Sequence, residues 1–71
     1  MQKVYLISTC ILKKKKCSVF HFKGYFKGEK IKEIYINDLN FELNSEYLIK
    51  LKVLGIKNGI VFGESLKSKV L

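Results

Sequence analysis

The 71-residue sequence contains no proline, no alanine and no arginine. Proline interrupts strands because it lacks a backbone N–H, so its absence leaves long, unbroken strands open to the chain. The absence of alanine, beside abundant valine, isoleucine, phenylalanine and tyrosine, favours strands over helices. Arginine binds phosphates and guanine edges through two parallel hydrogen bonds, so its absence argues against sequence-specific recognition of bases.

Cysteine and histidine are scarce in this sequence. Cys10 and Cys17 are its two cysteines, too few for the disulfide framework of a small secreted domain. They flank a run of lysines, so a disulfide between two neighbouring strands is geometrically conceivable. Two reduced thiols are the favoured interpretation. His21 is the single histidine and no further ligand lies at metal spacing, so we expect no metal and no cofactor.

Acidic residues are few and isolated, which bears on catalysis. The six carboxylates stand singly among lysines, and no nucleophile has an obvious base beside it. We therefore expect a protein that is not an enzyme and has no small-molecule substrate.

Long hydrophobic runs are absent as well. The apolar stretch from Val4 to Leu12 spans nine residues, whereas a helix that crosses a membrane needs about 20. The stretch is also too short for a secretory signal peptide. We expect a soluble, cytoplasmic protein without a membrane partner.

Lysine is the residue that the sequence has in excess. Fourteen basic residues, all lysine, stand against six acidic ones and give a formal net charge of +8 in a chain that we interpret as one domain, residues 1–71. Such a surplus favours a polyanionic partner: nucleic acid, an anionic membrane surface or an acidic protein. An AT-rich genome, which enriches lysine, isoleucine and asparagine, would explain the same excess without any selection for binding.

The clearest structural signal covers residues 46–64. Residues alternate here with the period of a strand that has one buried face. One face consists of Tyr47, Ile49, Leu51 and Val53, and the other of Leu48, Lys50, Lys52 and Leu54. Asn58-Gly59 predicts a two-residue type I′ turn, and Ile60-Val61-Phe62 the returning strand. Gly55 and Gly63 indicate bulges or tight bends within the two arms. The pattern predicts a strongly bent hairpin with the other strands arranged around it.

Three further strands are predicted over residues 3–12, 17–27 and 31–36. Residues 13–16 are four adjacent lysines, whose mutual repulsion favours an exposed loop. Residues 37–45 are rich in turn formers and predict a connection. Within it, Phe41 and Leu43 are expected to plug one end of the structure. Residues 65–71 predict either a short sixth strand or a frayed tail.

The pairing of residues 17–27 with residues 31–36 follows from burial. A two-residue turn at Gly28-Glu29 would leave Ile34 and Ile36 on the polar face. A slip by one residue exchanges the faces of a strand, so burial favours the register that puts both isoleucines beside Phe22 and Phe26. That register requires a wider loop or a bulge. It also gathers the following residues on the other, exposed face: Lys23, Tyr25, Ile31, Glu33 and Tyr35.

Five strongly bent strands remove their exposed edges by closing on one another. The long first strand, the meander, the connection and the final hairpin together resemble an OB-fold, a small, partly open, five-stranded all-β barrel. The resemblance covers nearly the whole chain and depends on strand order and length. A typical OB-fold carries a helix between its third and fourth strands, for which residues 37–45 are too short and too rich in asparagine. An SH3-like or Sm-like barrel is the alternative.

OB-folds that bind single-stranded nucleic acid use the face of their second and third strands. The resemblance implies a site for single-stranded DNA or RNA, with little sequence preference, formed by Lys13, Lys14, Lys15, Lys16, His21, Lys23, Tyr25, Lys27, Tyr35 and Lys57. The tyrosines would stack on bases and the lysines would contact phosphates. A packed cross-strand pair is the alternative role for Tyr25 and Tyr35, and a solvated loop is the alternative for residues 13–16.

A protein-interaction module is the second functional hypothesis. A small barrel has room inside for some of its apolar residues, so the rest would form a mixed apolar outer face made of Ile7, Ile11, Leu48, Leu54 and Val61. Such a face predicts a homo-oligomer or a structural or adaptor protein with a protein partner. Salt distinguishes the two hypotheses, because it weakens contacts with nucleic acid and leaves an apolar interface intact.

Overall fold

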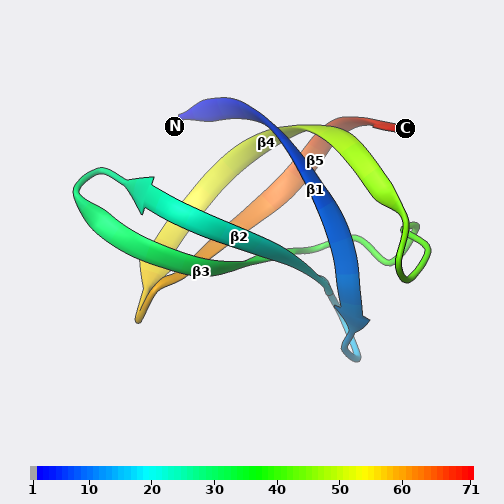
Figure 1. Ribbon diagram of the computed structural model, residues 1–71, viewed down its shortest axis with the longest axis horizontal. Helices are drawn as coiled ribbons and strands as arrows, with labels where there is room; N and C mark the ends of the chain where they lie inside the picture. The colour runs from blue at the N-terminus through cyan, green and yellow to red at the C-terminus, as the bar shows by residue number, and fades with distance from the viewer. Residues whose placement is uncertain (1) are drawn as a thin grey trace.

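The computed structural model describes residues 2–71 and contains five strands joined into one barrel (Figure 1). The strands are β1 (Lys3–Lys13), β2 (Ser18–Phe26), β3 (Glu29–Ile36), β4 (Glu46–Lys57) and β5 (Ile60–Val70). Every regular element within residues 2–71 is a strand, which confirms the predicted all-β class. Within the same residues there is no helix that is long and apolar enough to cross a membrane.

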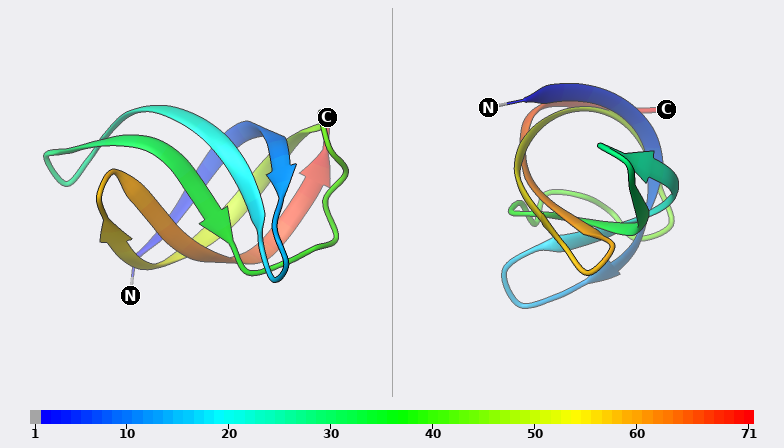
Figure 2. Two further views of the ribbon diagram at one scale, coloured as in Figure 1. Left: turned by 90° about the horizontal axis from the view of Figure 1, so that it is seen from below. Right: turned by 90° about the vertical axis from the view of Figure 1, so that its left-hand side faces the viewer.

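The strands follow the order β1-β2-β3-β5-β4 around the barrel, and β4 pairs with β1 to complete the ring (Figure 2). Neighbouring strands are antiparallel except β3 and β5, which are parallel, with Ile34 beside Val61 and Tyr35 beside Phe62. This parallel pair closes the barrel, where the sequence had predicted a partly open one. Closure protects the backbone N–H and C=O groups that an edge strand would expose.

The hairpin of β4 and β5 has the predicted turn. Asn58 and Gly59 have φ angles of 52° and 75°, as a type I′ turn requires, and Lys57 lies opposite Ile60. The pairing shifts between Val53 and Gly55, which confirms a bulge at the first glycine. Gly63 has a different role: a Cβ there would lie 2.6 Å from Cδ1 of Leu51, so the strand can approach the core only without a side chain.

Residues 65–71 form neither a sixth strand nor a frayed tail, because β5 continues through them to Val70. β4 is twelve residues long and offers a partner over this whole length, so that Tyr47 lies opposite Val70. A second shift, between Lys50 and Leu51, accommodates an extra residue of β5 in the ladder. The final residues therefore belong to the barrel wall.

The hairpin of β2 and β3 turns more tightly than predicted. Lys27 and Gly28 have positive φ angles of 52° and 77°, and Phe26 lies opposite Glu29. The wider loop is therefore absent, and the alternative predicted with it, a bulge, is found inside the strands as a register shift between His21 and Gly24. Ile34 and Ile36 face the core as predicted. Ile31, predicted on the exposed face, is buried as well, because the irregularity brings it opposite Gly24 on the core side.

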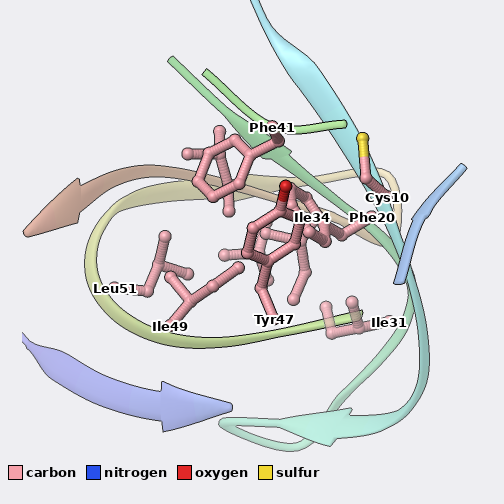
Figure 3. Close-up of a cluster of buried hydrophobic side chains, with 10 residues drawn as sticks. Cys10, Phe20, Ile31, Ile34, Phe41, Tyr47, Ile49 and Leu51 are labelled. Carbon is pink, nitrogen blue, oxygen red and sulfur yellow. The ribbon is translucent and has the colours of Figure 1, made fainter. Parts of the chain in front are cut away.

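Three aromatic rings occupy the centre of the core (Figure 3). Phe41 meets Phe20 edge to face with 5.0 Å between ring centroids, and meets Tyr47 at 4.9 Å. The Tyr47 hydroxyl accepts a hydrogen bond from the backbone N–H of Glu42 at 2.8 Å, which holds the 37–45 connection against the barrel. Phe41 therefore plugs the barrel end as predicted, whereas Leu43 is 51% exposed and does not.

Aliphatic residues and one thiol complete the core around these rings. The buried residues are Cys10, Ile31, Ile34, Ile36, Ile49, Leu51 and Val61. Val61 was predicted on the outer face, but its parallel neighbour Ile34 points inward and residues side by side in a sheet share a face. Cys10 and Cys17 are free thiols, so the structure contains no bridge between them.

β1 and β2 are paired over only part of their lengths. On the edges that face each other, only Cys10, Leu12 and Lys13 of β1 lie opposite residues of β2. Lys3–Thr9 are paired on their other edge, with β4, and residues 21–26 on theirs, with β3. We call the gap between residues 3–9 and residues 21–26, which are not paired with each other, the β1–β2 seam. The Ser8 hydroxyl donates to the His21 carbonyl across it. Beneath the seam is a cavity of about 150 Å³ lined by Val4, Tyr5, Leu6, Phe22, Phe26, Ile34, Leu51, Val53 and Val61.

Candidate functional site

An aromatic pair lies on the outer surface where β3 and β5 meet. Because Ile34 and Val61 point into the barrel, their neighbours Tyr35 and Phe62 point outward. The two rings meet edge to face with 5.5 Å between centroids. Phe62 is 37% exposed, and Tyr35 is half-buried. We call this pair the Tyr35–Phe62 platform.

Lys14 approaches the platform from the loop between β1 and β2. Its backbone N–H donates to the Cys17 carbonyl at 2.8 Å, which folds the loop back toward the barrel. Its ammonium nitrogen then lies 4.9 Å from the centroid of the Tyr35 ring. Hydrogen bonding with the Tyr35 side chain raises the pKa of Lys14 above its ordinary value. An exposed ammonium of this kind is attracted by the ring and remains free to move onto an anionic group.

A second cation lies on the opposite side of the platform. His21, Glu33, Ile60 and Lys57 occupy one row across β2, β3, β5 and β4, next to the row that contains Tyr35 and Phe62. Lys57 ends β4 just before the two-residue turn and is exposed. The platform therefore has Lys14 on one side and Lys57 on the other, with His21 at the far end of the second row.

The lysine run contributes unequally to this face. The Lys13 ammonium donates to the Leu39 carbonyl at 2.9 Å, so it braces the 37–45 connection. Lys15 and Lys16 are exposed in the loop. Of these four lysines, Lys14 is the one whose ammonium lies over the platform.

Tyr25 lies far from the platform. It is 71% exposed and opposite Lys30, beside the turn of the β2–β3 hairpin. The residue opposite Tyr35 is Val19, and Tyr25 lies six positions further along β2, which corresponds to about 20 Å of strand. Lys23 and Lys27 belong to this end of the hairpin too, and the Lys27 ammonium lies 5.9 Å from the Phe26 ring. The two predicted tyrosines therefore do not form one stacking surface.

Phe62 is a residue of this candidate site that was not predicted from the sequence. In the sequence, Val61 and Phe62 are adjacent apolar residues of a short strand, and nothing local indicates which one faces out. The parallel pairing with β3 decides it, because Val61 aligns with Ile34 and Phe62 with Tyr35. Lys32, whose backbone N–H donates to the Gly59 carbonyl at 2.8 Å, is a further exposed lysine beside the β4–β5 turn.

A second cationic surface, on β1, β4 and β5, was also missed. It forms a groove of about 230 Å³ lined by Tyr5, Leu48, Lys50, Lys67, Ser68 and Lys69. Alternation in β4 indicated that Lys50 is exposed, but the position of Lys67 and Lys69 depends on the continuation of β5, which was not predicted. We call this surface the Tyr5 groove.

Within residues 2–71, no three histidine, cysteine, aspartate or glutamate side chains are grouped so that they could hold a metal ion. Comparison of the chain with protein-family models, with curated proteins and with solved structures finds no match.

Proposed function

We propose that this protein is a small OB-like domain that binds single-stranded DNA or RNA with little sequence preference and without catalysis. The five-stranded barrel supports the OB-like assignment, because one of its connections, from β3 to β4, joins strands that are not neighbours in the ring, as in a Greek-key barrel. The observation that carries the function is the Tyr35–Phe62 platform, a partly exposed aromatic pair with Lys14 and Lys57 on its two sides.

Binding would combine stacking with charge. A base that stacks on Phe62 or Tyr35 gains about 1–3 kcal/mol and does so whatever its identity, because every base has a π-face. Lys14 is fully exposed, so it can leave the Tyr35 ring and contact a phosphate as the base arrives. Each phosphate contact releases counterions and makes the affinity dependent on salt. Lysine provides charge without the planar fork of arginine, which agrees with low sequence preference.

The test is fluorescence anisotropy with labelled single-stranded DNA and RNA between about 50 and 200 mM salt. We expect affinity to fall steeply as salt rises. Phe62→Ala and Tyr35→Ala should each weaken binding by about 5- to 150-fold, the equivalent of losing one stacked base. Tyr25→Ala removes a more exposed tyrosine from the same hairpin and is the matched control, with an expected change of less than about twofold.

Two results would contradict this proposal. Absence of binding at about 50 mM salt would exclude the function. Binding that weakens equally in all three variants, or in none of them, would exclude the platform as the stacking site.

A protein-interaction module is the second candidate, and the β1–β2 seam is the observation in its favour. Unpaired strand edges can accept an extended chain, and the cavity of about 150 Å³ beneath the seam could take its apolar side chains. Ile7, Ile11 and Leu54 are 59%, 42% and 42% exposed and would extend such an interface. Self-association that persists or strengthens at high salt in analytical ultracentrifugation would favour this candidate.

A further inference from the structure

The Tyr5 groove lies across the barrel from the centre of the proposed site. In the ring order β1-β2-β3-β5-β4, β1 and β4 are the strands opposite β3, which carries Tyr35. On the strands that the two sites share, Phe62 and Lys57 lie near the β4–β5 turn, whereas Leu48 and Lys69 lie toward the other end. A short ligand bound at the Tyr35–Phe62 platform therefore leaves the Tyr5 groove open.

Positive charge is concentrated in this groove by the strand register. Lys50 lies between Tyr5 of β1 and Lys67 of β5, so two ammonium-bearing residues are directly opposite each other. In the next row, Ile7, Leu48 and Lys69 are aligned. Like charges in directly opposed positions destabilise a sheet, and neither row contains a carboxylate that would compensate them. A bound anion would relieve this repulsion.

The groove also contains an exposed aromatic ring. Tyr5 is 70% exposed, and the Lys50 ammonium lies 5.7 Å from its ring centroid. This arrangement repeats the one at the platform, where the Lys14 ammonium lies 4.9 Å from the Tyr35 centroid. In each place a ring available for stacking stands beside lysines available for phosphate, which is the combination that binds single strands.

We infer that the Tyr5 groove is a second binding site for single-stranded nucleic acid, so that one chain holds two strand segments on opposite sides of the barrel. The inference rests on the proposed function. Tyr5 stacks on a base, while Lys50, Lys67 and Lys69 contact the adjoining phosphates. A protein of this kind bridges two strands, or two distant segments of one strand, without forming a dimer.

The test is the number of oligonucleotides bound per chain, measured by isothermal titration calorimetry at about 50 mM salt. The probe is a thymidine oligonucleotide of about six nucleotides, near the lower end of the length that one such barrel covers. We expect two bound per wild-type chain. The triple variant Lys50→Gln, Lys67→Gln, Lys69→Gln should bind one. Tyr5→Ala, which changes no charge, should weaken one of the two sites by about 5- to 150-fold.

A matched variant separates the groove from the general effect of net charge. Lys14→Gln, Lys32→Gln, Lys57→Gln removes the same three charges from the platform side, and it should bind one oligonucleotide that is sensitive to Tyr5→Ala. The first triple variant should instead bind one oligonucleotide that is sensitive to Phe62→Ala. These opposite sensitivities assign each bound strand to its own face.

Four results would overturn the inference. One oligonucleotide per wild-type chain, or two that survive the Lys50, Lys67 and Lys69 substitutions, would remove the second site and leave the proposed function standing. A wild type that binds a single oligonucleotide and floats with anionic vesicles, with flotation abolished by the same substitutions, would assign the groove to a membrane surface. Absence of binding by the wild type would overturn the proposed function as well.

Discussion

Replacing Gly63 by alanine tests how closely the barrel wall approaches the core. An added Cβ would lie 2.6 Å from Cδ1 and 2.8 Å from Cγ of Leu51, and Leu51 is fully buried. Gly63 also holds the closing strands together, because its carbonyl accepts a hydrogen bond from the Asn37 N–H at 3.0 Å. The extra methyl group must therefore displace either Leu51 or β5.

The magnitude follows from two opposing effects. Overpacking a core costs about 1–3 kcal/mol, and Leu51 can yield partly because it borders the cavity beneath the seam. The substitution also reduces the conformational entropy of the unfolded chain, which stabilises by about 0.4–1 kcal/mol. We expect a net loss of about 0.5–2 kcal/mol in the free energy of unfolding. Each kcal/mol lowers the melting temperature of a domain of this size by about 4–8 °C.

Gly55→Ala is the matched control, because a Cβ at Gly55 meets no atom within 4 Å. It should leave stability unchanged or raise it by up to about 1 kcal/mol. Urea and thermal unfolding followed by far-ultraviolet circular dichroism measure both variants, since the protein has no tryptophan to report by fluorescence. If Gly63→Ala proves as stable as Gly55→Ala, the close approach of Gly63 to Leu51 is wrong.

Two further predictions concern the barrel end and the platform. Phe41→Ala should lower the free energy of unfolding by about 3–5 kcal/mol and leave the barrel largely unfolded at 25 °C. Leu43→Ala should change it by less than about 0.5 kcal/mol. Equal melting temperatures for the two variants would refute the role of Phe41 as the plug of the barrel end. Tyr35→Phe should lower the pKa of Lys14 toward its ordinary value in an NMR titration of the lysine side chains, and an unchanged pKa would exclude the contact with the hydroxyl. Because the Lys14 pKa is raised, the contribution of this contact to stability is fully present at neutral pH and is lost only as pH rises through that pKa, so it should not make stability vary with pH near pH 7.

The β4–β5 hairpin could be predicted because its information is local. Alternation over residues 47–53 sets the buried face, and Asn58-Gly59 sets the turn. The parallel pairing of β3 with β5 has no such local signal, because its partners lie far apart in the sequence. Phe62 was missed for this reason: its outward direction depends on a register that forms only when the barrel closes.

The candidate site was predicted in part for the same physical reason. Tyr35 and the cations Lys14 and Lys57 were recognised from residue type and from the strands that carry them. The separation of Tyr25 from Tyr35 was not predicted, because it depends on the tight turn and on the irregularity between His21 and Gly24. Burial favours the correct inward isoleucines with either a wide loop or an internal bulge, so it cannot choose between the two geometries.

The short ladder between β1 and β2, next to the β1–β2 seam, determines where the barrel opens. β1, β4 and β5 are paired along most of their lengths, whereas the β2–β3 hairpin joins them through a brief antiparallel ladder and a brief parallel one (Figure 1). The hairpin can thus detach as a unit while the other three strands stay together, and its amides should exchange with solvent as a group. Tyr35 belongs to the hairpin and Phe62 to the three-stranded part, so a nucleic-acid strand stacked across both rings, as proposed, would oppose this motion. A nucleic-acid strand bound in the Tyr5 groove would contact the three-stranded part alone and would leave the hairpin free to open.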